Sequence, residues 1–425
     1  MKSKIEAHKS TLRSVIDLLS KPMKVSYPLN DEGFSNIWLL GAGKASISMA
    51  QKIIDRKGVS AQDGIIITNE KIPSLKSVQI FKGAHPYPDE NSVSASYELI
   101  TLARKIPAEE TVVFCLSGGA SSLLCIPPKG IEIEELAYTY ELLLNSGAPI
   151  NKLNIVRKHL CSLKGGQLAQ ALHHTNLITV ISSDVPNDDL ETIGSAPTIC
   201  DSSTFKDAFQ VLKKYGLWNE VPHSIRIHIV KGMSGDIPDT PKPGVNDHPN
   251  HKVKIVSKAV SLANQIGLIL KEEGYNTLIA DTAYDGDVRK VSKTICSKAI
   301  SVLSNNDILK KPAALIYYGE STVEVKGSGK GGRNQELALI SAISIEGQHS
   351  ISMLSIGTDG IDGPTDVAGA IVTSETTLLA RKKKLNPEEY LQNNDSYHFH
   401  KEMSTSVRIG PTGKNLMDLQ VVIIE

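Results

Sequence analysis

Short apolar runs alternate with amphipathic segments along the first half of the chain. Four of these runs are typical of buried strands: Asn36–Leu40, Gly64–Thr68, Thr111–Leu116 and Leu177–Ser182. Helical periodicity or a long insertion separates them, so the pattern predicts βαβ units and a mainly parallel sheet. Such a sheet binds ligands at the carboxyl ends of its strands, and we therefore expect functional residues in the loops after these runs.

The pattern changes at Asp236–Asn250, a polar segment that contains four prolines. Proline at this density resists both helix and central strand, which indicates an ordered loop or linker near a domain boundary. We therefore predict an N-terminal domain over residues 1–240 and a C-terminal domain over residues 251–425. The later pattern predicts helices at Val253–Glu273 and Asp287–Leu303, and strands at Asn276–Ala280, Ala313–Tyr318, Ser321–Lys326 and His349–Ile356.

The first twenty residues predict a helix rather than a signal peptide. Their apolar positions share one helix face, and they form neither an unbroken apolar region nor a small-residue cleavage site. These positions are Ile5, Leu12, Val15, Ile16 and Leu19. No apolar run approaches the ~20 residues that span a bilayer. We expect a cytoplasmic protein without membrane contact.

Composition excludes two further classes of protein. The 425 residues include 46 Lys plus Arg and 46 Asp plus Glu, a balance that argues against a nucleic-acid scaffold with a basic footprint. The five cysteines are widely spaced and form no CxxC pair. This usage argues against disulfides and structural zinc, and favours reduced thiols in a core.

Two glycine-rich loops follow the first and third predicted strands. Gly41–Ser46 (GAGKAS) opens a helix, where amides approach an anion and Lys44 adds a positive charge. It lacks the third glycine of GxGxxG, and a plain strand-to-helix turn explains it equally well. Ser117–Ser122 (SGGASS) can form a concave anion site or a simple turn.

Two later segments carry basic residues. Asn154–Gly166 includes Arg157 and Lys164, although a solvated face commonly explains such a run. In Glu320–Glu336 an alternating strand enters a loop with four glycines and three cations, and a helix then begins. That density of amides and cations suits a triphosphate better than it suits a surface hairpin.

Two aspartate-rich loops also follow predicted strands. Ser183–Asp189 contains Asp184 and Asp189, and Gly357–Asp366 contains Asp359. Phosphoryl transfer uses Mg²⁺, which binds one or two carboxylates together with phosphate oxygens. An Asp/Gly turn explains either loop taken alone.

A set of motifs occurs in a fixed order along nearly the whole chain. They are GAGKA, AHPYPDE, LSGGASS, SGAPINKLNIVRKHLCSLKGG, SSDVPNDDLETIGSAPT, TPKPG, GESTVEVKGSGKGGRNQELAL, GTDGIDGPTDVAGA, NDS and GPTGKN. This order resembles the class II glycerate kinase family, whose members have a C-terminal MOFRL domain. The resemblance implies an α/β protein with a large Rossmann-like parallel-sheet domain and a smaller α/β domain, in which the MOFRL-like region covers about 312–420. It also implies an active site in the cleft between the domains.

The resemblance further implies ATP- and Mg²⁺-dependent phosphorylation of D-glycerate, with 2-phosphoglycerate favoured over 3-phosphoglycerate. We expect glycerate and ATP as the only partners of a monomer or homodimer. The expected catalytic residues are Lys44, Arg333 and Asp184, and the expected metal ligands are Asp189 and Asp359. The expected binding residues are Gly41, Gly43, Ser117, Gly118, Gly119, Ser121, Arg157, Lys164, Lys330, Gly331, Gly332, Asn334 and Glu336. One aspartate could instead orient or deprotonate the substrate hydroxyl.

This sequence departs from the family pattern at several loop positions. Ala120 and Ala196 stand where glycine is usual, and either alanine would be strained at positive φ. Asn187 also replaces a frequent glycine, Gln167 replaces a usual arginine and Lys414 replaces a common threonine. These departures bear on the assignment of substrate specificity more than on the assignment of the reaction.

Two alternatives compete with a kinase. The first is an NAD(P)-dependent hydroxypyruvate or hydroxy-acid reductase, in which Glu70 would bind a ribose. The missing third glycine and the late cationic loop argue against it. The second is a non-catalytic sensor of an organic acid or sugar phosphate, which would leave the two acidic loops without a role.

Overall fold

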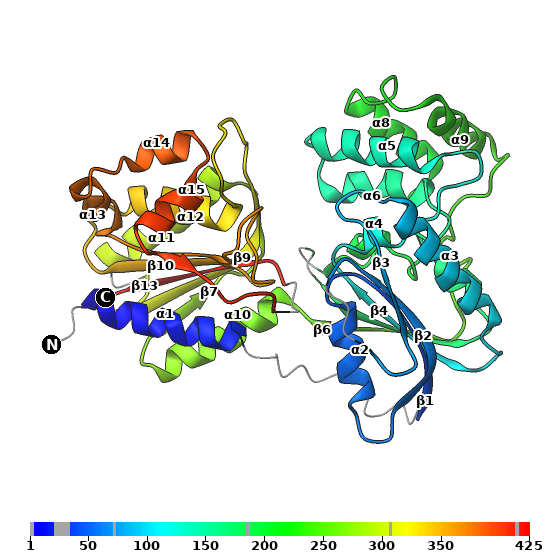
Figure 1. Cartoon of the computed structure of the whole chain (residues 1–425), viewed down its shortest axis with the longest axis horizontal. Coiled ribbons are helices and arrows are strands. Elements are labelled where there is room, and N and C mark those ends of the chain that lie inside the picture. Colours follow the sequence, from blue (N-terminus) through cyan, green and yellow to red (C-terminus); the bar gives the residue numbers. More distant parts are fainter. Residues whose placement is uncertain are drawn as a thin grey trace. The chain divides into compact units, whose positions relative to one another are not determined.

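The computed structural model describes residues 4–20, 35–70, 74–183, 185, 188–305, 308–412 and 416–425. The chain forms two compact units. The N-terminal unit is Ser26–Val256, and the C-terminal unit joins Met1–Val25 to Ser257–Glu425. Each unit is built around its own sheet (Figure 1).

In the described part of the N-terminal unit, six strands form a sheet in the order β3-β2-β1-β4-β5-β6. The strands are β1 (Asn36–Ala42), β2 (Ser60–Thr68), β3 (Gln79–Lys82), β4 (Thr111–Ser117), β5 (Asn176–Ser182) and β6 (His251–Ser257). The pairs β2–β3, β1–β2, β1–β4 and β4–β5 are parallel. This is the strand order of Rossmann folds, whose direction of winding reverses between the first and fourth strands. Ligands bind at that switch point, where the loops after β1 and β4 begin.

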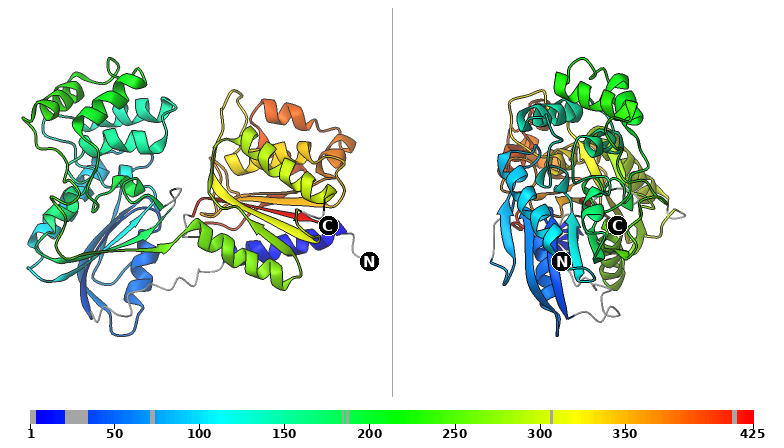
Figure 2. Two further views of the ribbon diagram at one scale, coloured as in Figure 1. Left: turned by 180° about the vertical axis from the view of Figure 1, so that it is seen from behind. Right: turned by 90° about the vertical axis from the view of Figure 1, so that its right-hand side faces the viewer.

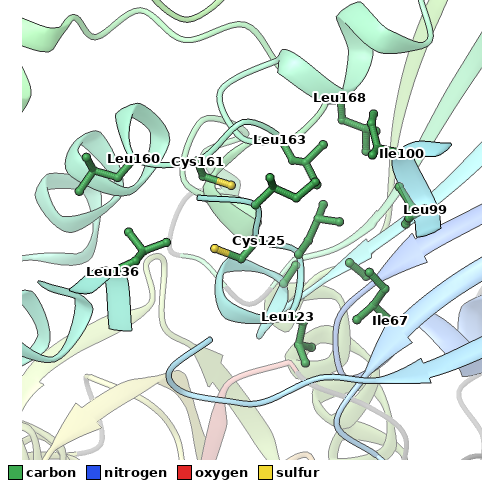
Figure 3. Close-up of a cluster of buried hydrophobic side chains, with 14 of the residues drawn as sticks. Ile67, Leu99, Ile100, Leu123, Cys125, Leu136, Leu160, Cys161, Leu163 and Leu168 are labelled. Carbon is green, nitrogen blue, oxygen red and sulfur yellow. The ribbon is translucent and has the colours of Figure 1, made fainter. Parts of the chain in front are cut away.

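Helices cover the N-terminal sheet. They are α2 (Ser46–Ile54), α3 (Glu90–Lys105), α4 (Ala120–Leu123), α5 (Ile133–Asn145), α6 (Ile150–His159), α7 (Gln167–Ala171), α8 (Phe205–Lys214) and α9 (His223–Ser234). Figure 1 shows α2 and α3 on opposite sides of the sheet. Residues Val112–Ser117 of β4 are all buried, as expected for a parallel strand covered on both faces. Leucines from several of the helices surround Cys125 and Cys161 in the core (Figure 3).

The C-terminal unit contains a mixed sheet in the order β12-β11-β10-β13-β9-β7, with β8 also paired to β9. The strands are β7 (Asn276–Ile279), β8 (Tyr284–Asp287), β9 (Ala313–Thr322), β10 (Ile351–Gly357), β11 (Gly369–Thr373), β12 (Ser406–Val407) and β13 (Asp418–Ile424). Strands β7 and β8 are parallel to β9, whereas β13 is antiparallel to both β9 and β10. The first residue of β13, Asp418, therefore lies beside the carboxyl-terminal ends of its neighbours β9 and β10.

Side chains of the central strand β13 alternate between two cores. Leu419, Val421 and Ile423 pack with α1 (Lys4–Ser20) and α10 (Ala259–Glu272). Its remaining apolar residues pack on the other face with α11 (Val288–Ser304) and α12 (Arg333–Ser344), and Figure 2 shows α1 and α10 together below the sheet. The unit also contains α13 (Thr376–Lys382), α14 (Pro387–Gln392) and α15 (Ser396–Glu402). None of the helices in the described part of the chain is both long and apolar enough to cross a membrane.

The structure confirms an α/β protein with a Rossmann-like parallel sheet and a second α/β unit, but several elements differ from the prediction. The sequence placed the first helix in a domain over 1–240, whereas Leu12 and Leu19 of α1 are buried in the C-terminal unit. The helix predicted over 253–273 begins at Ala259, because Val253 and Ile255 alternate in β6 and pack against the N-terminal core. The segments predicted as two strands over 313–326 form one strand, which ends at Thr322.

Candidate active site

The loops after β1 and β4 interlock at the switch point. Gly43 has a φ of +125°, and a Cβ atom there would lie 2.3 Å from Ser117 Oγ, so glycine is required for this approach. The Lys44 amide donates to the Gly118 carbonyl oxygen at 2.9 Å. The Ala45 amide donates to Ser117 Oγ, also at 2.9 Å. Gly43 and Ser117 therefore fix the shape of the loop that carries Lys44.

Lys44 and His85 converge on Gly119. A Cβ atom at Gly119 would lie 3.4 Å from Lys44 Cγ and 3.3 Å from His85 Cδ2. Desolvation, followed by the positive charges of Lys44 and Arg157, lowers the pKa of His85 to about 4. His85 is exposed to solvent, which screens these charges. At neutral pH His85 is an uncharged imidazole beside two cations.

Arg157 of α6 lies at the same site and is connected to the loop after β4. Its Nη1 atom is 3.4 Å from Asn154 Oδ1, and its guanidinium carbon lies 5.0 Å from the centre of the Tyr140 ring. Asn154 Oδ1 accepts a hydrogen bond from Ser195 Oγ at 3.0 Å. Ser195 Oγ lies 2.8 Å from Ser121 Oγ in the first turn of α4. The predicted residues Lys44, Ser117, Gly119, Ser121 and Arg157 are therefore brought together.

The two residues that follow Arg157 on α6 contact carboxylates away from the loops after β1 and β4. Lys158 Nζ lies 2.5 Å from Asp201 Oδ1, and His159 Nε2 lies 2.9 Å from Asp239 Oδ1. The side chains of Lys158 and His159 are almost completely buried. These pairs anchor α6 to the segments that precede α8 and β6, and they leave Arg157 as the basic residue of this run at the site.

The structure gives Gly41 and Lys164 internal positions. A Cβ atom at Gly41 would lie 3.0 Å from a carbonyl oxygen of β4, so this glycine permits close strand packing. Lys164 is fully buried, and its ammonium donates to the Leu124 carbonyl oxygen at 2.6 Å and to Cys161 Sγ at 3.2 Å. Burial opposes ionisation of Cys161, but a hydrogen bond from Cys125 and the charge of Lys164 lower its pKa. Lys164 has the environment of a structural residue rather than of a ligand contact.

The loop at Ala196 has the strained conformation that the sequence raised as a possibility. Ala196 has φ 55° and ψ 57°, in the left-handed region, while Ala120 begins α4 and needs no unusual backbone. The Ala196 carbonyl oxygen accepts a hydrogen bond from the Gly166 amide at 2.8 Å. Gln167 donates to the Cys161 carbonyl oxygen at 2.7 Å, so it binds the backbone rather than facing a ligand.

The acidic loop after β5 is only partly described. Asp184, the predicted catalytic aspartate, lies outside the described residues. Asp189 is exposed, and its two carboxylate oxygens accept hydrogen bonds from the Glu191 amide at 3.1 Å and from Thr192 Oγ1 at 2.6 Å. The Thr192 carbonyl oxygen in turn accepts a hydrogen bond from Asn154 Nδ2 at 2.9 Å. Asp189 therefore supports the turn behind Asn154.

In the C-terminal unit, Arg333 binds two carboxylates. Its Nε donates to Asp418 Oδ2 at 2.6 Å, its Nη2 donates to Asp418 Oδ1 at 3.1 Å, and its Nη1 contacts the Glu320 carboxylate. Burial raises the pKa of Asp418 to about 7, although the charge and hydrogen bonds of Arg333 act in the opposite direction. Arg333, at the start of α12, therefore joins the ends of β9 and β13.

The N-terminus of α12 is already occupied by a carboxylate. Asp362 accepts hydrogen bonds from the amides of Asn334 at 3.0 Å and Gln335 at 2.9 Å, in the position that favours an anion. Burial raises the pKa of Asp362 despite these bonds. Asn334 and Glu336 are also buried, and Glu336 accepts a hydrogen bond from Asn394 at 3.1 Å. The structure therefore places the predicted binding residues Asn334 and Glu336 inside the fold.

The glycine-rich loop 326–332 lies against Asn393–Ser396. Asn394 Oδ1 accepts hydrogen bonds from the amides of Lys326 at 2.8 Å and Gly327 at 2.9 Å. The amides of residues 328–330 bind Asn393 and Asp395 in the same way. A Cβ atom at Gly331 would lie 2.3 Å from Ser396 Oγ. Close approach of another segment therefore accounts for these glycines, and many of the loop amides are already bonded.

Lys330 and Asp359 remain the accessible predicted residues beside this loop. Lys330 is exposed, and its Nζ lies 4.9 Å from the centre of the Tyr397 ring. Asp359 is half-buried, with Oδ1 accepting a hydrogen bond from the Ile361 amide at 3.1 Å. No cluster of three or more metal-binding His, Cys, Asp or Glu side chains occurs among the residues that the structure describes.

Several residues at the two sites were absent from the predicted set. These are His85, Asn154, Ser195, Glu320, Asp362 and Asp418. All of these except Asp418 occur within the motifs already recognised, so membership of a motif was a usable signal for them. Asp418 reaches its position through an antiparallel register, which no local pattern reveals.

Comparison with known proteins agrees with this architecture. A domain of unknown function, DUF4147, matches residues 4–230, and the MOFRL family matches residues 313–418. A D-glycerate 2-kinase from Thermotoga maritima is 35% identical over 424 residues, which cover 98% of this chain and 99% of the relative. A glycerate 2-kinase from Pyrococcus horikoshii is 35% identical over 391 residues, covering 91% of this chain and 87% of the relative.

A solved structure of similar fold supports the same grouping. The crystal structure of a glycerate kinase from Thermotoga maritima matches with a TM-score of 0.84 at 35% identity, covering 99% of each chain. Sequence similarity and fold therefore agree over both units. The chain belongs to the glycerate kinase family whose members carry a MOFRL domain, and it is a kinase.

Proposed function

We propose that this kinase transfers the terminal phosphoryl group of ATP to D-glycerate and forms 2-phosphoglycerate. The observation that carries the proposal is the cationic site at the β1/β4 switch point, in a chain 35% identical to a D-glycerate 2-kinase over 98% of its length. Lys44 lies just before α2 and faces a loop rich in amides and hydroxyls, which suits an anionic substrate.

Within this proposal, Lys44 stabilises the charge that develops on the transferred phosphoryl group. Gly43 and Ser117 hold the Lys44 loop in position, and the amides of Gly118 and Gly119 face the bound anion. His85 is an uncharged neighbour that can donate or accept a hydrogen bond without adding a third positive charge. Preorganised donors of this kind stabilise a transition state because they need no rearrangement during the reaction.

Arg333 is the second proposed catalytic residue. Its guanidinium is satisfied by Asp418 and Glu320, and Glu320 is half exposed, at 51%. A phosphate oxygen could replace Glu320 while Asp418 continues to hold the other edge of the guanidinium. Lys330 and the backbone of Gly331 and Gly332 would contact the nucleotide beside it.

Mg²⁺ fits this chain as an ion held mainly by phosphate oxygens. Mg²⁺ commonly takes only one or two protein carboxylates, so it needs no larger acidic cluster. Asp359 fits this role because it is only half-buried, whereas both oxygens of Asp189 already accept hydrogen bonds. We propose Asp359 as a carboxylate ligand for Mg²⁺, and Asp184 as the catalytic aspartate. The bound ion would neutralise phosphate charge.

The direct test is ADP release that depends on D-glycerate and on Mg²⁺. The product is identified by adding enolase, which converts 2-phosphoglycerate to phosphoenolpyruvate but requires a mutase to use 3-phosphoglycerate. Phosphoenolpyruvate formed without mutase supports the proposal. Formation only with mutase makes 3-phosphoglycerate the product, and full activity in excess chelator excludes the role of Mg²⁺.

The same preparation tests the alternatives. Oxidation of NADH with hydroxypyruvate, without glycerate-dependent ADP release, would replace the proposal with a reductase. Stabilisation by glycerate without turnover would indicate a sensor. We further propose that the enzyme acts in the cytoplasm as a monomer or homodimer, which fractionation and light scattering test.

A further inference from the structure

Arg157 is a buried cation without a matching anion among the described residues. Its exposed fraction is 5%, and its Nε atom has no hydrogen-bond partner there. Its contact with Asn154 is long, at 3.4 Å, and Tyr140 offers only a ring face. In contrast, its neighbours Lys158 and His159 each contact a carboxylate.

Such an environment is costly for a guanidinium. Arginine stays protonated in proteins, so it cannot escape burial by losing its charge. Burial lowers the pKa of Arg157, the direction expected for a cation with no carboxylate beside it. A buried charge that is unpaired in the free protein is stabilised when a ligand supplies the counter-charge. The site therefore favours a ligand with a negative group.

The surroundings of Arg157 select the shape of that group. Asn154 joins it to the hydroxyls of Ser195 and Ser121, which lie 2.8 Å apart. The Nε and Nη atoms along one edge of a guanidinium match the two coplanar oxygens of a carboxylate. Phosphate would instead favour the Lys44 loop, where a helix begins at the switch point.

We propose that Arg157 binds the carboxylate of the hydroxy-acid substrate, assisted by the Ser121 hydroxyl, and so selects acids over neutral polyols. This inference rests on the proposed glycerate kinase function and adds the group that recognises the acid. The carboxylate is held by Arg157 while the substrate hydroxyl faces the Lys44 loop. The residue is a specificity determinant rather than a donor or acceptor of the transferred group.

The decisive experiment varies the enzyme and the substrate together. Arg157→Gln and Arg157→Lys are assayed with D-glycerate and with D-glyceramide, in which an uncharged amide replaces the carboxylate. We expect wild-type kcat/KM to favour glycerate by about 100-fold, within the range for losing one partner of a buried charge pair. Arg157→Gln should lose about 100-fold with glycerate but less than threefold with glyceramide, and Arg157→Lys should recover part of the loss.

Arg226→Gln is the matched control. Arg226 belongs to the same unit, is half-buried, and also has an unpartnered Nε among the described atoms, but it lies on α9. Substitution of Arg226 should leave kcat/KM unchanged for both D-glycerate and D-glyceramide. An equal loss for both substrates in Arg157→Gln, together with a raised ATP KM, would assign Arg157 to phosphate and overturn the proposal.

Binding without turnover separates this inference from the proposed function. D-glycerate alone should raise the melting temperature of the wild type but not of Arg157→Gln, and glycerol should affect neither. If glycerate protects through Arg157 but no ADP is released, the kinase proposal fails and the carboxylate site stands. If the wild type phosphorylates glycerate and glyceramide equally well, the inference fails even should Arg157→Gln not fold. Equal turnover of the two substrates would mean that a carboxylate of the chain itself, and not the substrate, compensates the charge of Arg157.

Discussion

Arg157 in the N-terminal unit and Arg333 in the C-terminal unit have opposite electrostatic surroundings. Arg157 is buried with its Nε unpartnered among the described residues, whereas Arg333 contacts both Asp418 and Glu320. The two guanidinium groups therefore differ in how readily each can bind an anionic ligand. An anion at Arg157 adds a missing partner, while an anion at Arg333 must replace one.

This contrast extends to the loops that carry the two residues. The N-terminal site combines Lys44, Arg157 and neutral His85, so its net positive charge favours the binding of an anion. In the C-terminal unit, Asp362 already binds the amides at the start of α12, and Asp418 at the start of β13 already binds Arg333. The N-terminal site is thus preorganised for binding, and the C-terminal site needs an exchange of partners.

The largest expected effect is on Lys44. Lys44→Met should lower kcat by about 100-fold or more, about 2.7 kcal/mol of barrier, because no other lysine lies on the described loop at the switch point. Lys330→Met is the comparison in the C-terminal unit and should lower kcat by less than about threefold while raising the ATP KM, since Lys330 is exposed and is proposed to contact the nucleotide. Steady-state kinetics with both substrates varied measures the two losses. A larger loss at Lys330 would reverse the comparison between the units.

Arg333→Lys should lower kcat by about 10- to 100-fold, with a smaller change in glycerate KM. A lysine cannot hold Asp418 with two bonds and a phosphate oxygen at the same time. Glu320→Gln sharpens this test, because it removes the carboxylate that must be displaced. It should lower the ATP KM by about threefold. An increase in ATP KM for Glu320→Gln would show that Glu320 positions Arg333 instead of competing with the nucleotide.

Asp418 should make the C-terminal unit less stable as the pH rises from about 4 to about 7. Its pKa is raised in the folded state to about 7, from an ordinary value of 3.8, so the folded protein holds a proton that the unfolded chain has released. This contribution is complete below pH 4 and lost above pH 7, with a magnitude of about 1–3 kcal/mol. Hydrogen exchange of β13 amides measures it, and Asp418→Asn should flatten the profile.

His85 should give the N-terminal unit the opposite slope. Its folded pKa is lowered to about 4 from 6.5, so stability is complete above about pH 6.5 and declines as the pH falls toward 4. The ring is largely exposed, so we expect no more than about 1 kcal/mol. Both tryptophans, Trp38 and Trp218, lie in this unit, and their fluorescence follows its unfolding. Equal profiles for wild type and His85→Gln would remove the contrast.

The smallest effect is expected at Ala196. Replacing it with glycine relieves the left-handed strain but adds unfolded-chain entropy, and the net gain should be about 0.5 kcal/mol. Ala120→Gly is the control and should destabilise the protein by about 0.5–1 kcal/mol, because Ala120 is helical. Urea unfolding followed by tryptophan fluorescence measures both. Destabilisation by Ala196→Gly would show that the strain is relieved elsewhere.

Local patterns predicted the N-terminal sheet well because its strands are buried on both faces. The run predicted at Thr111–Leu116 is apolar from Val112 onward, and the structure extends it by only one residue. The predicted strand ends also located the loops that meet at the switch point, since the loops that follow parallel strands all begin at the carboxyl ends of those strands. The helix expected over 253–273 was less accurate, because a short alternating strand was hidden in a longer helical pattern.

By itself the sequence determined the fold class, the family and the segments in which Lys44, Arg157 and Arg333 occur. It could do so because apolar periodicity and glycine positions are local properties of the chain. Only the tertiary structure decided which cations are compensated. Arg333 meets Asp418 across 85 positions of sequence, and the amides of loop 326–330 bind residues 393–395. Charge compensation depends on distances of a few ångströms between distant segments, and no residue pattern records those distances.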